Sequence, residues 1–176
     1  MRRGRLAIAL ALALAVPAAG NAGTSEASSS TLTRASSLES LLLTEINSVR
    51  AARGLRTLSR SDALTRAAMG HSSSMVTLGF FSHESRNGTS FSQRLSRFYA
   101  RSPKGWTVGE NLAMFSGVAP TAKAIVDAWM ASPSHRANVL RQQFREAGVA
   151  IVHHPAAGGV FGGLPTWVIT FDAGRR

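Results

Sequence analysis

The sequence contains no cysteine, and this absence excludes several classes of protein. Without thiols the chain has no disulfide framework, no thiolate zinc site and no cysteine nucleophile. Acidic residues are also scarce, with 9 aspartates and glutamates against 20 lysines and arginines, which gives a formal net charge of +11. The only lysines are Lys104 and Lys123. This preference for arginine reflects genome composition and is not taken as a sign of RNA binding.

Common catalytic motifs are missing as well. The chain has no HExxH zinc motif, no glycine-rich phosphate loop between a strand and a helix, and no GxSxG nucleophile elbow. Hydrophobic residues make up 44% and charged residues 16% of the sequence, which excludes a disordered chain. A length of 176 residues predicts one domain once any processed end is removed.

Residues 1–22 have the composition of a secretory signal peptide. Three arginines within the first five residues precede an apolar run over 6–16, and small residues follow it. The run is too short to cross a bilayer as a helix, which needs about 20 residues. We therefore expect cleavage after Ala22, or alternatively after Gly20. The mature chain would have no transmembrane helix and a net charge of +8, and it would be secreted or held in the periplasm or cell envelope.

Residues 23–35 are rich in serine and threonine and lack periodicity, which predicts a flexible leader. Residues 36–174 form one continuous globular pattern and predict a single, monomeric domain. Ser36 and Glu39 are expected to form a capping box at the first helix, and Gly54 is expected to end it. The second helix is expected to bury Leu78.

The apolar spacing predicts an α+β fold in which helices cover an antiparallel sheet. Helices are expected to begin at Ser36, near Ser59 or Ser61, and at Phe91, Val118 and Pro133. Strands are expected over 108–115, 147–153 and 166–172, with a long hairpin loop over 155–165 between the last two.

Three polar residues at the ends of predicted elements are candidates for a functional site: His83, Glu110 and His135. Polar groups in such positions can face a cleft on a rigid frame. Each also has a structural interpretation, since Glu110 could accept backbone N–H bonds in a turn, His83 could lie in a surface turn and His135 could cap its own helix. His71 lies on an apolar helical face and is expected to be a hydrogen-bonded core histidine that borders the site.

Several segments, in this order, resemble the bacterial branch of the CAP superfamily, also called the SCP-like extracellular proteins. The resemblance covers roughly residues 38–173. The segments that carry it are Arg50–Leu55, His71–Met75, Phe81-Ser82-His83, Gly109-Glu110-Asn111-Leu112-Ala113, Trp129–Leu140, Gly148-Val149-Ala150 and Trp167. Two of these stretches, GENLA and WMASPSHRANVL, are the most specific.

This resemblance implies a three-layer α–β–α sandwich with a small antiparallel sheet and an open cleft. In the family, two histidines and one or two glutamates line that cleft, and some members bind zinc or another divalent cation there. The matching positions are His83, Glu110 and His135, and His71, Asn111 and Ser132 are expected beside them. Animal and plant members often have a second glutamate where this chain has Ser132. A glycine often follows the final aromatic residue, where this chain has Asp172.

Two functions follow as alternatives. The first is an exported, non-catalytic module that binds a lipid, a peptide or a cell-wall component in the cleft. The second is a metal-assisted hydrolase acting on peptide or cell-wall substrates, in which two imidazoles and a carboxylate hold zinc and a water whose pKa falls to about 7. The arginines are scattered and are not interleaved with aromatic residues, so no specific nucleic-acid binding is expected.

Overall fold

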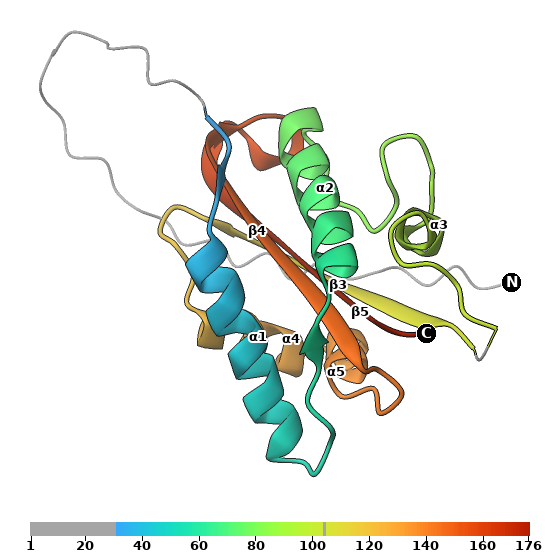
Figure 1. Cartoon of the computed structure of the whole chain (residues 1–176). Coiled ribbons are helices and arrows are strands. Elements are labelled where there is room, and N and C mark those ends of the chain that lie inside the picture. The colour runs from blue at the N-terminus through green and yellow to red at the C-terminus, as the bar shows by residue number, and fades with distance from the viewer. Residues whose placement is uncertain (1–30, 104) are drawn as a thin grey trace, which may run out of the picture.

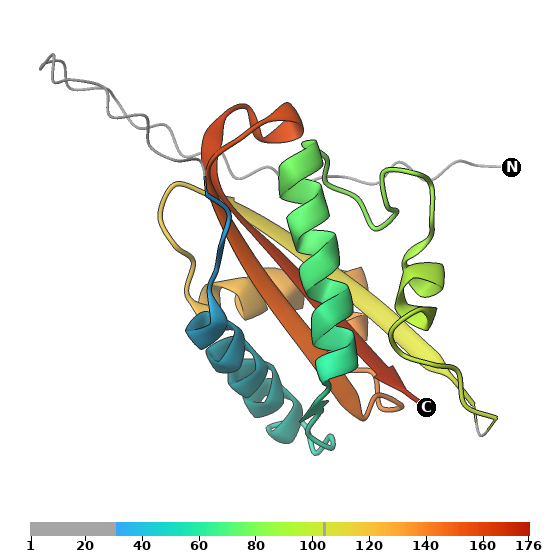
Figure 2. The ribbon, with the colours of Figure 1, turned by 45° about the horizontal axis from the view of Figure 1, so that its top comes forward.

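The computed structural model describes residues 31–103 and 105–176. The predicted signal peptide, residues 1–22, lies outside the described residues, and so do residues 23–30 of the predicted leader. A sheet that is antiparallel except for one two-residue strand lies between two layers of helices, as Figures 1 and 2 show. The α–β–α sandwich implied by the resemblance is therefore confirmed. None of the described helices is long and apolar enough to cross a membrane.

Three long antiparallel strands form the centre of the sheet: β3 (Thr107–Ser116), β4 (Glu146–Ala157) and β5 (Leu164–Arg175). Two short strands, β1 (Thr33–Arg34) and β2 (Ser59–Arg60), pair with the outer edge of β4. The strand order is β1-β4-β5-β3, so the last strand in the sequence is a central one. The predicted strands are confirmed, but the hairpin loop is shorter than predicted because pairing continues to Ala157 and Leu164.

One face of the sheet is covered by α1 (Ser36–Ala51), α4 (Ala122–Ala131) and α5 (Pro133–Val139). The other face is covered by α2 (Asp62–Leu78), and α3 (Phe91–Ser96) lies beside α2 and contacts β3 (Figure 2). Successive side chains of a strand point to opposite faces. In β5 this alternation buries Ile169, Phe171 and Ala173 with the α1 and α4 side chains and directs the residues between them toward α2.

The predicted capping box at the start of α1 is wrong. Ser36 is already the first residue of the helix, so the cap position falls on Ala35, which has no side chain that can cap. Glu39 is buried and binds other groups. Its carboxylate pairs with Arg34 at 2.6 Å and accepts the backbone N–H of Ile151 at 3.1 Å. Because β1 pairs with β4, the last residues of the predicted flexible leader belong to the folded domain.

Other helix boundaries agree more closely with the sequence pattern. Gly54 has a φ of 67° after α1, and the N–H of Leu55 reaches back to the carbonyl of Arg50 at 3.0 Å, which is the predicted glycine termination. The fourth helix begins at Ala122 and not at Val118, because the hydroxyl of Thr121 caps it. Pro133 occupies the first turn of α5, as predicted.

Helix α2 lies unusually close to the sheet, and this proximity places the polar side chains of the site. A Cβ atom on Gly148 of β4 would lie only 2.1 Å from the backbone nitrogen of Thr65. Further along α2, the hydroxyl of Ser72 bonds to the hydroxyl of Thr170 on β5 at 2.7 Å. Leu78, predicted to be buried, is 52% exposed because it lines an open pocket beside α2 and does not pack on the sheet.

Candidate functional site

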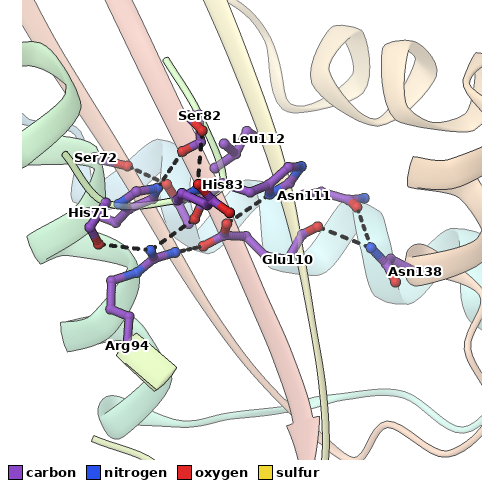
Figure 3. A network of polar contacts seen from close by, with 12 residues as sticks. His71, Ser72, Ser82, His83, Arg94, Glu110, Asn111, Leu112 and Asn138 are labelled. Carbon is purple, nitrogen blue, oxygen red and sulfur yellow. Dashed lines mark hydrogen bonds and ion pairs between the residues drawn. The ribbon is translucent and has the colours of Figure 1, made fainter. Parts of the chain in front are cut away.

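Glu110 on β3 is the centre of a buried polar network (Figure 3). Its side chain is fully buried, and its two carboxylate oxygens have different partners. Nδ1 of His83 donates to Oε1 at 2.8 Å, and a guanidinium N–H of Arg94 donates to Oε2. Burial alone would raise the pKa of Glu110, but the hydrogen bond from His83 and the charge of Arg94 outweigh burial and hold this pKa below its usual value. Glu110 is therefore ionised at neutral pH.

His83 lies in the segment between α2 and α3, and 45% of its side chain is exposed. Since the Glu110 carboxylate accepts from Nδ1, Nδ1 carries the proton of the neutral ring. Nε2 is then left as an acceptor. Arg94 also donates to the backbone carbonyl of His83 at 3.0 Å, so one guanidinium holds both the glutamate and the segment that carries the histidine.

His135 is half-buried in the first turn of α5, and its main chain is tied to the same part of β3. Nδ2 of Asn111 donates to the carbonyl of His135 at 2.9 Å, and Asn138 donates to the carbonyl of Glu110 at 3.0 Å. Burial, and then the charge that His83 carries when protonated, lower the pKa of His135, so this ring is uncharged at neutral pH. The fold therefore brings His83, Glu110 and His135 to one region.

His71, Asn111 and Ser132, which were predicted beside these three residues, differ in their burial and in their contacts with the site. His71 is 1% exposed, and its Nε2 bonds to the carbonyl of Ser82 at 2.8 Å, so it supports the segment that carries His83. Asn111 is fully buried. Ser132 lies 3.3 Å from the hydroxyl of Ser134 and has no described contact with either histidine or with Glu110. His71 and Asn111 thus bind the main chain of the two segments that carry His83 and His135.

The sequence analysis missed the role of Arg94 and the position of Asp172. Asp172 lies directly opposite Glu110 in the β3–β5 register and is completely buried. As a carboxylate it would have no hydrogen-bond partner among the described residues. Burial, followed by the negative charge of Glu110, raises its pKa well above the usual value. Asp172 is therefore a neutral acid, and its hydroxyl group can donate a hydrogen bond to the Glu110 carboxylate.

These contacts bear on the metal centre predicted at His83, Glu110 and His135. Both oxygens of Glu110 are already engaged, which leaves two imidazoles available as ligands. Within residues 31–103 and 105–176, no group of three or more histidines, aspartates and glutamates is arranged to hold a metal ion. A catalytic zinc site normally has three protein ligands, so the described arrangement does not fit one.

The predicted cleft is not one of the two cavities described. These cavities have volumes of about 270 and 360 Å³, and His83, Glu110 and His135 line neither of them. The two imidazoles instead lie at the surface above a buried carboxylate.

The three-layer fold and the His–Glu network on its central sheet define a CAP-type domain. Comparison with known families agrees, because the model of the CAP family, described as the cysteine-rich secretory protein family, matches residues 43–171. The chain belongs to this family, although it contains no cysteine itself.

Two similar proteins come from Bacillus species. An uncharacterized protein, YkwD of Bacillus subtilis (strain 168), is 34% identical over 107 residues, which cover 60% of this chain and 39% of that protein. An extracellular SCP-domain protein from Bacillus anthracis (strain Ames) has a TM-score of 0.57 at 25% identity, covering 76% of this chain and 40% of that one. The chain thus spans about two-fifths of the length of these relatives.

A third similarity extends over nearly the whole of the other protein. An outer surface protein from Borrelia burgdorferi has a TM-score of 0.61 at 18% identity, and the match covers 81% of this chain and 98% of that one. At this identity the similarity shows the fold alone.

Proposed function

We propose that this protein is an exported, non-catalytic binding module that engages its ligand through His83 and His135. The observation that carries the proposal is that Glu110 is buried and that each of its two oxygens already accepts a hydrogen bond, from His83 on one oxygen and from Arg94 on the other. Because the carboxylate is buried and both of its oxygens are bonded to protein donors, it serves to fix an imidazole. It is not free to exchange protons with a substrate. The accessible chemistry of the site is then that of two imidazole rings.

The orientation of His83 indicates which chemical groups a ligand would present to it. With Nδ1 bonded to Glu110, Nε2 accepts hydrogen bonds, so hydroxyl and amide N–H groups are suitable partners. Cell-wall polymers are rich in both groups. The positive charge of the chain adds a screened attraction to anionic components of the cell envelope.

Export is part of the proposal. It is supported by the signal-like composition of residues 1–22 and by the name of one similar protein, the extracellular SCP-domain protein from Bacillus anthracis. A cell-envelope ligand is consistent with that location.

Co-sedimentation of the protein with insoluble peptidoglycan tests this function. We expect the wild-type protein to sediment and the double variant His83→Ala/His135→Ala to lose at least about tenfold in affinity, the effect of roughly 1.4 kcal/mol. His154→Ala is the matched control, because this histidine lies on β4 and has no described contact with the site. Equal sedimentation of the wild-type protein and the double variant would contradict the proposed role of the two histidines.

A hydrolase is the second candidate, and the hydrogen bond between His83 and Glu110 favours it. A carboxylate that orients an imidazole is the arrangement of a general base, with Nε2 able to take a proton from water. Turnover of peptide, ester or cell-wall substrates that disappears in both Glu110→Gln and His83→Ala would establish this activity. Turnover that survives in these variants would come from another site or from a contaminant.

A further inference from the structure

A cavity of about 360 Å³ lies between α2 and α3. His71 and Arg94 line it, whereas His83 and His135 do not. Its volume falls within the range of about 300–1,000 Å³ that is typical of small-molecule sites. Gly70 and Ser74 form part of the α2 wall, and Arg86 and Arg97 belong to the opposite side. This cavity takes no part in the function proposed above.

The charge of this cavity has one sign. Its lining includes Arg86, Arg94 and Arg97 and no acidic residue. Arg94 is neutralised by Glu110, but its Nε is buried and has no acceptor among the described residues. Arg86 and Arg97 are exposed and take part in none of the ion pairs described for residues 31–103 and 105–176. The cavity therefore presents two uncompensated guanidinium groups.

An apolar surface accompanies these cations. Phe98 is 42% and Leu78 is 52% exposed, and both line the cavity. Large apolar side chains next to unpaired arginines suit a molecule that carries both an anionic and an apolar part.

Gly70 supplies an independent observation. It lies in the interior of α2, where glycine is among the least favourable residues. Packing does not require it, since a Cβ at this position would meet no atom within 4 Å. The lack of a side chain leaves the α2 wall of the cavity open.

We propose that the cavity between α2 and α3 binds a small organic anion. A phosphate or carboxylate group is held by Arg86 and Arg97, and the apolar part of the molecule contacts Phe98 and Leu78. Guanidinium groups bind both kinds of oxyanion through charge-assisted, paired hydrogen bonds.

Calorimetric titration of the full chain with phenyl phosphate and with benzoate tests the proposal. Benzyl alcohol, which has the ring without the charge, is the neutral comparison. We expect saturable binding of at least one of the two anions. The anion with the higher affinity identifies whether phosphate or carboxylate is the preferred head group. Absence of saturable binding for both anions, or binding of benzyl alcohol with equal affinity, would overturn the proposal.

Substitutions in the lining of the cavity test whether the anion binds there. Arg97→Ala and Arg86→Ala are each expected to weaken the preferred anion roughly three- to tenfold, as for loss of one charge-assisted contact. Gly70→Leu should block the cavity and abolish binding without disturbing the helix, because leucine is a good helix former. Arg136→Ala, which removes an exposed arginine of α5, is the control and should leave the affinity unchanged. Unchanged affinity in the Arg86→Ala/Arg97→Ala double variant would overturn the proposed location.

Discussion

Glu110 and Asp172 are two buried carboxyl groups on adjacent strands, and their surroundings give them different charges. His83 and Arg94 both favour the ionised form of Glu110. Asp172 is fully buried, would have no hydrogen-bond partner as an anion among the described residues and lies beside the charge of Glu110, so it retains its proton. At the scale of single residues, the site is thus an anion that is held by one histidine, one arginine and one neutral acid.

Replacement of Asp172 by asparagine should change how stability depends on pH. The pKa of Asp172 is raised in the folded state, whereas an unfolded aspartate titrates near 3.9. Above that value the unfolded chain releases a proton that the folded chain retains, so stability falls as pH rises toward the folded pKa. Asp172→Asn should remove this decline, which is about 1.4 kcal/mol for each pH unit in that window, as measured by urea unfolding between pH 4 and 8.

The control is Asp127→Asn on α4, which removes a carboxylate that is 62% exposed. It should keep the pH slope of the wild-type protein. A parallel slope for the wild-type protein and Asp172→Asn would mean that Asp172 is ionised in the folded state.

Zinc addition tests the metal centre predicted from the sequence. With Glu110 held by His83 and Arg94, we expect micromolar zinc to leave the melting temperature unchanged. A ligand that binds the folded state alone raises this temperature. A zinc-dependent increase that both His83→Ala and His135→Ala abolish would instead establish the metal centre with the two imidazoles as its ligands.

The sequence was a good guide to some of these residues and a poor one to others. His83, Glu110 and His135 stand at the ends of recognisable elements, so they could be selected before the fold was known. Arg94 could not, because a cation on a short helix has the same pattern whether it faces solvent or a buried glutamate. The environment of Asp172 depends on the register of β3 against β5, which no local pattern specifies.

At the scale of elements, the close contact between α2 and β4 determines where the site lies. The helix approaches the sheet at Gly148, and this approach places His71 and Ser72 over β5. The sequence predicted α2 and β4 separately from their periodicities. Their contact could not be predicted, because glycine in a strand is equally consistent with a bulge.

Two glycine substitutions should have opposite effects. Gly148→Ala would bring a methyl group to 2.1 Å from the backbone of α2, so the helix would have to move. We expect a loss of roughly 3 kcal/mol or more in the free energy of unfolding.

Gly70→Ala introduces a methyl group into open space and should stabilise the protein by about 0.5–1 kcal/mol. Thermal and urea unfolding measure both changes, and a mild effect of Gly148→Ala would contradict the described contact.

At the scale of the whole molecule, the folded domain extends further toward the N-terminus than the sequence indicated. Pairing of β1 with β4 and the contact of Glu39 with Ile151 join residues 33–39 to the sheet. The predicted cleavage sites lie more than ten residues earlier in the sequence, after Gly20 or Ala22. Cleavage at either position would leave every described element intact.

Expression of the full chain in a secretion-competent bacterium tests the predicted export. We expect the protein in the medium or cell envelope to begin at Gly23, or at Asn21 for the alternative cleavage site. Peptide sequencing of the N-terminus distinguishes these outcomes. A product retained in the cytoplasm with residues 1–22 attached would refute the prediction.

The central position of β5 has a consequence for biosynthesis. β3 and β4 do not pair with each other, and each pairs with β5, which comes last of the three in the sequence. A nascent polypeptide that has emerged from the ribosome only as far as Pro155 lacks the strand that joins the two halves of its sheet. The domain therefore cannot complete its fold during translation of the earlier segments. Such a delay favours the unfolded form that the proposed export through a translocation channel requires.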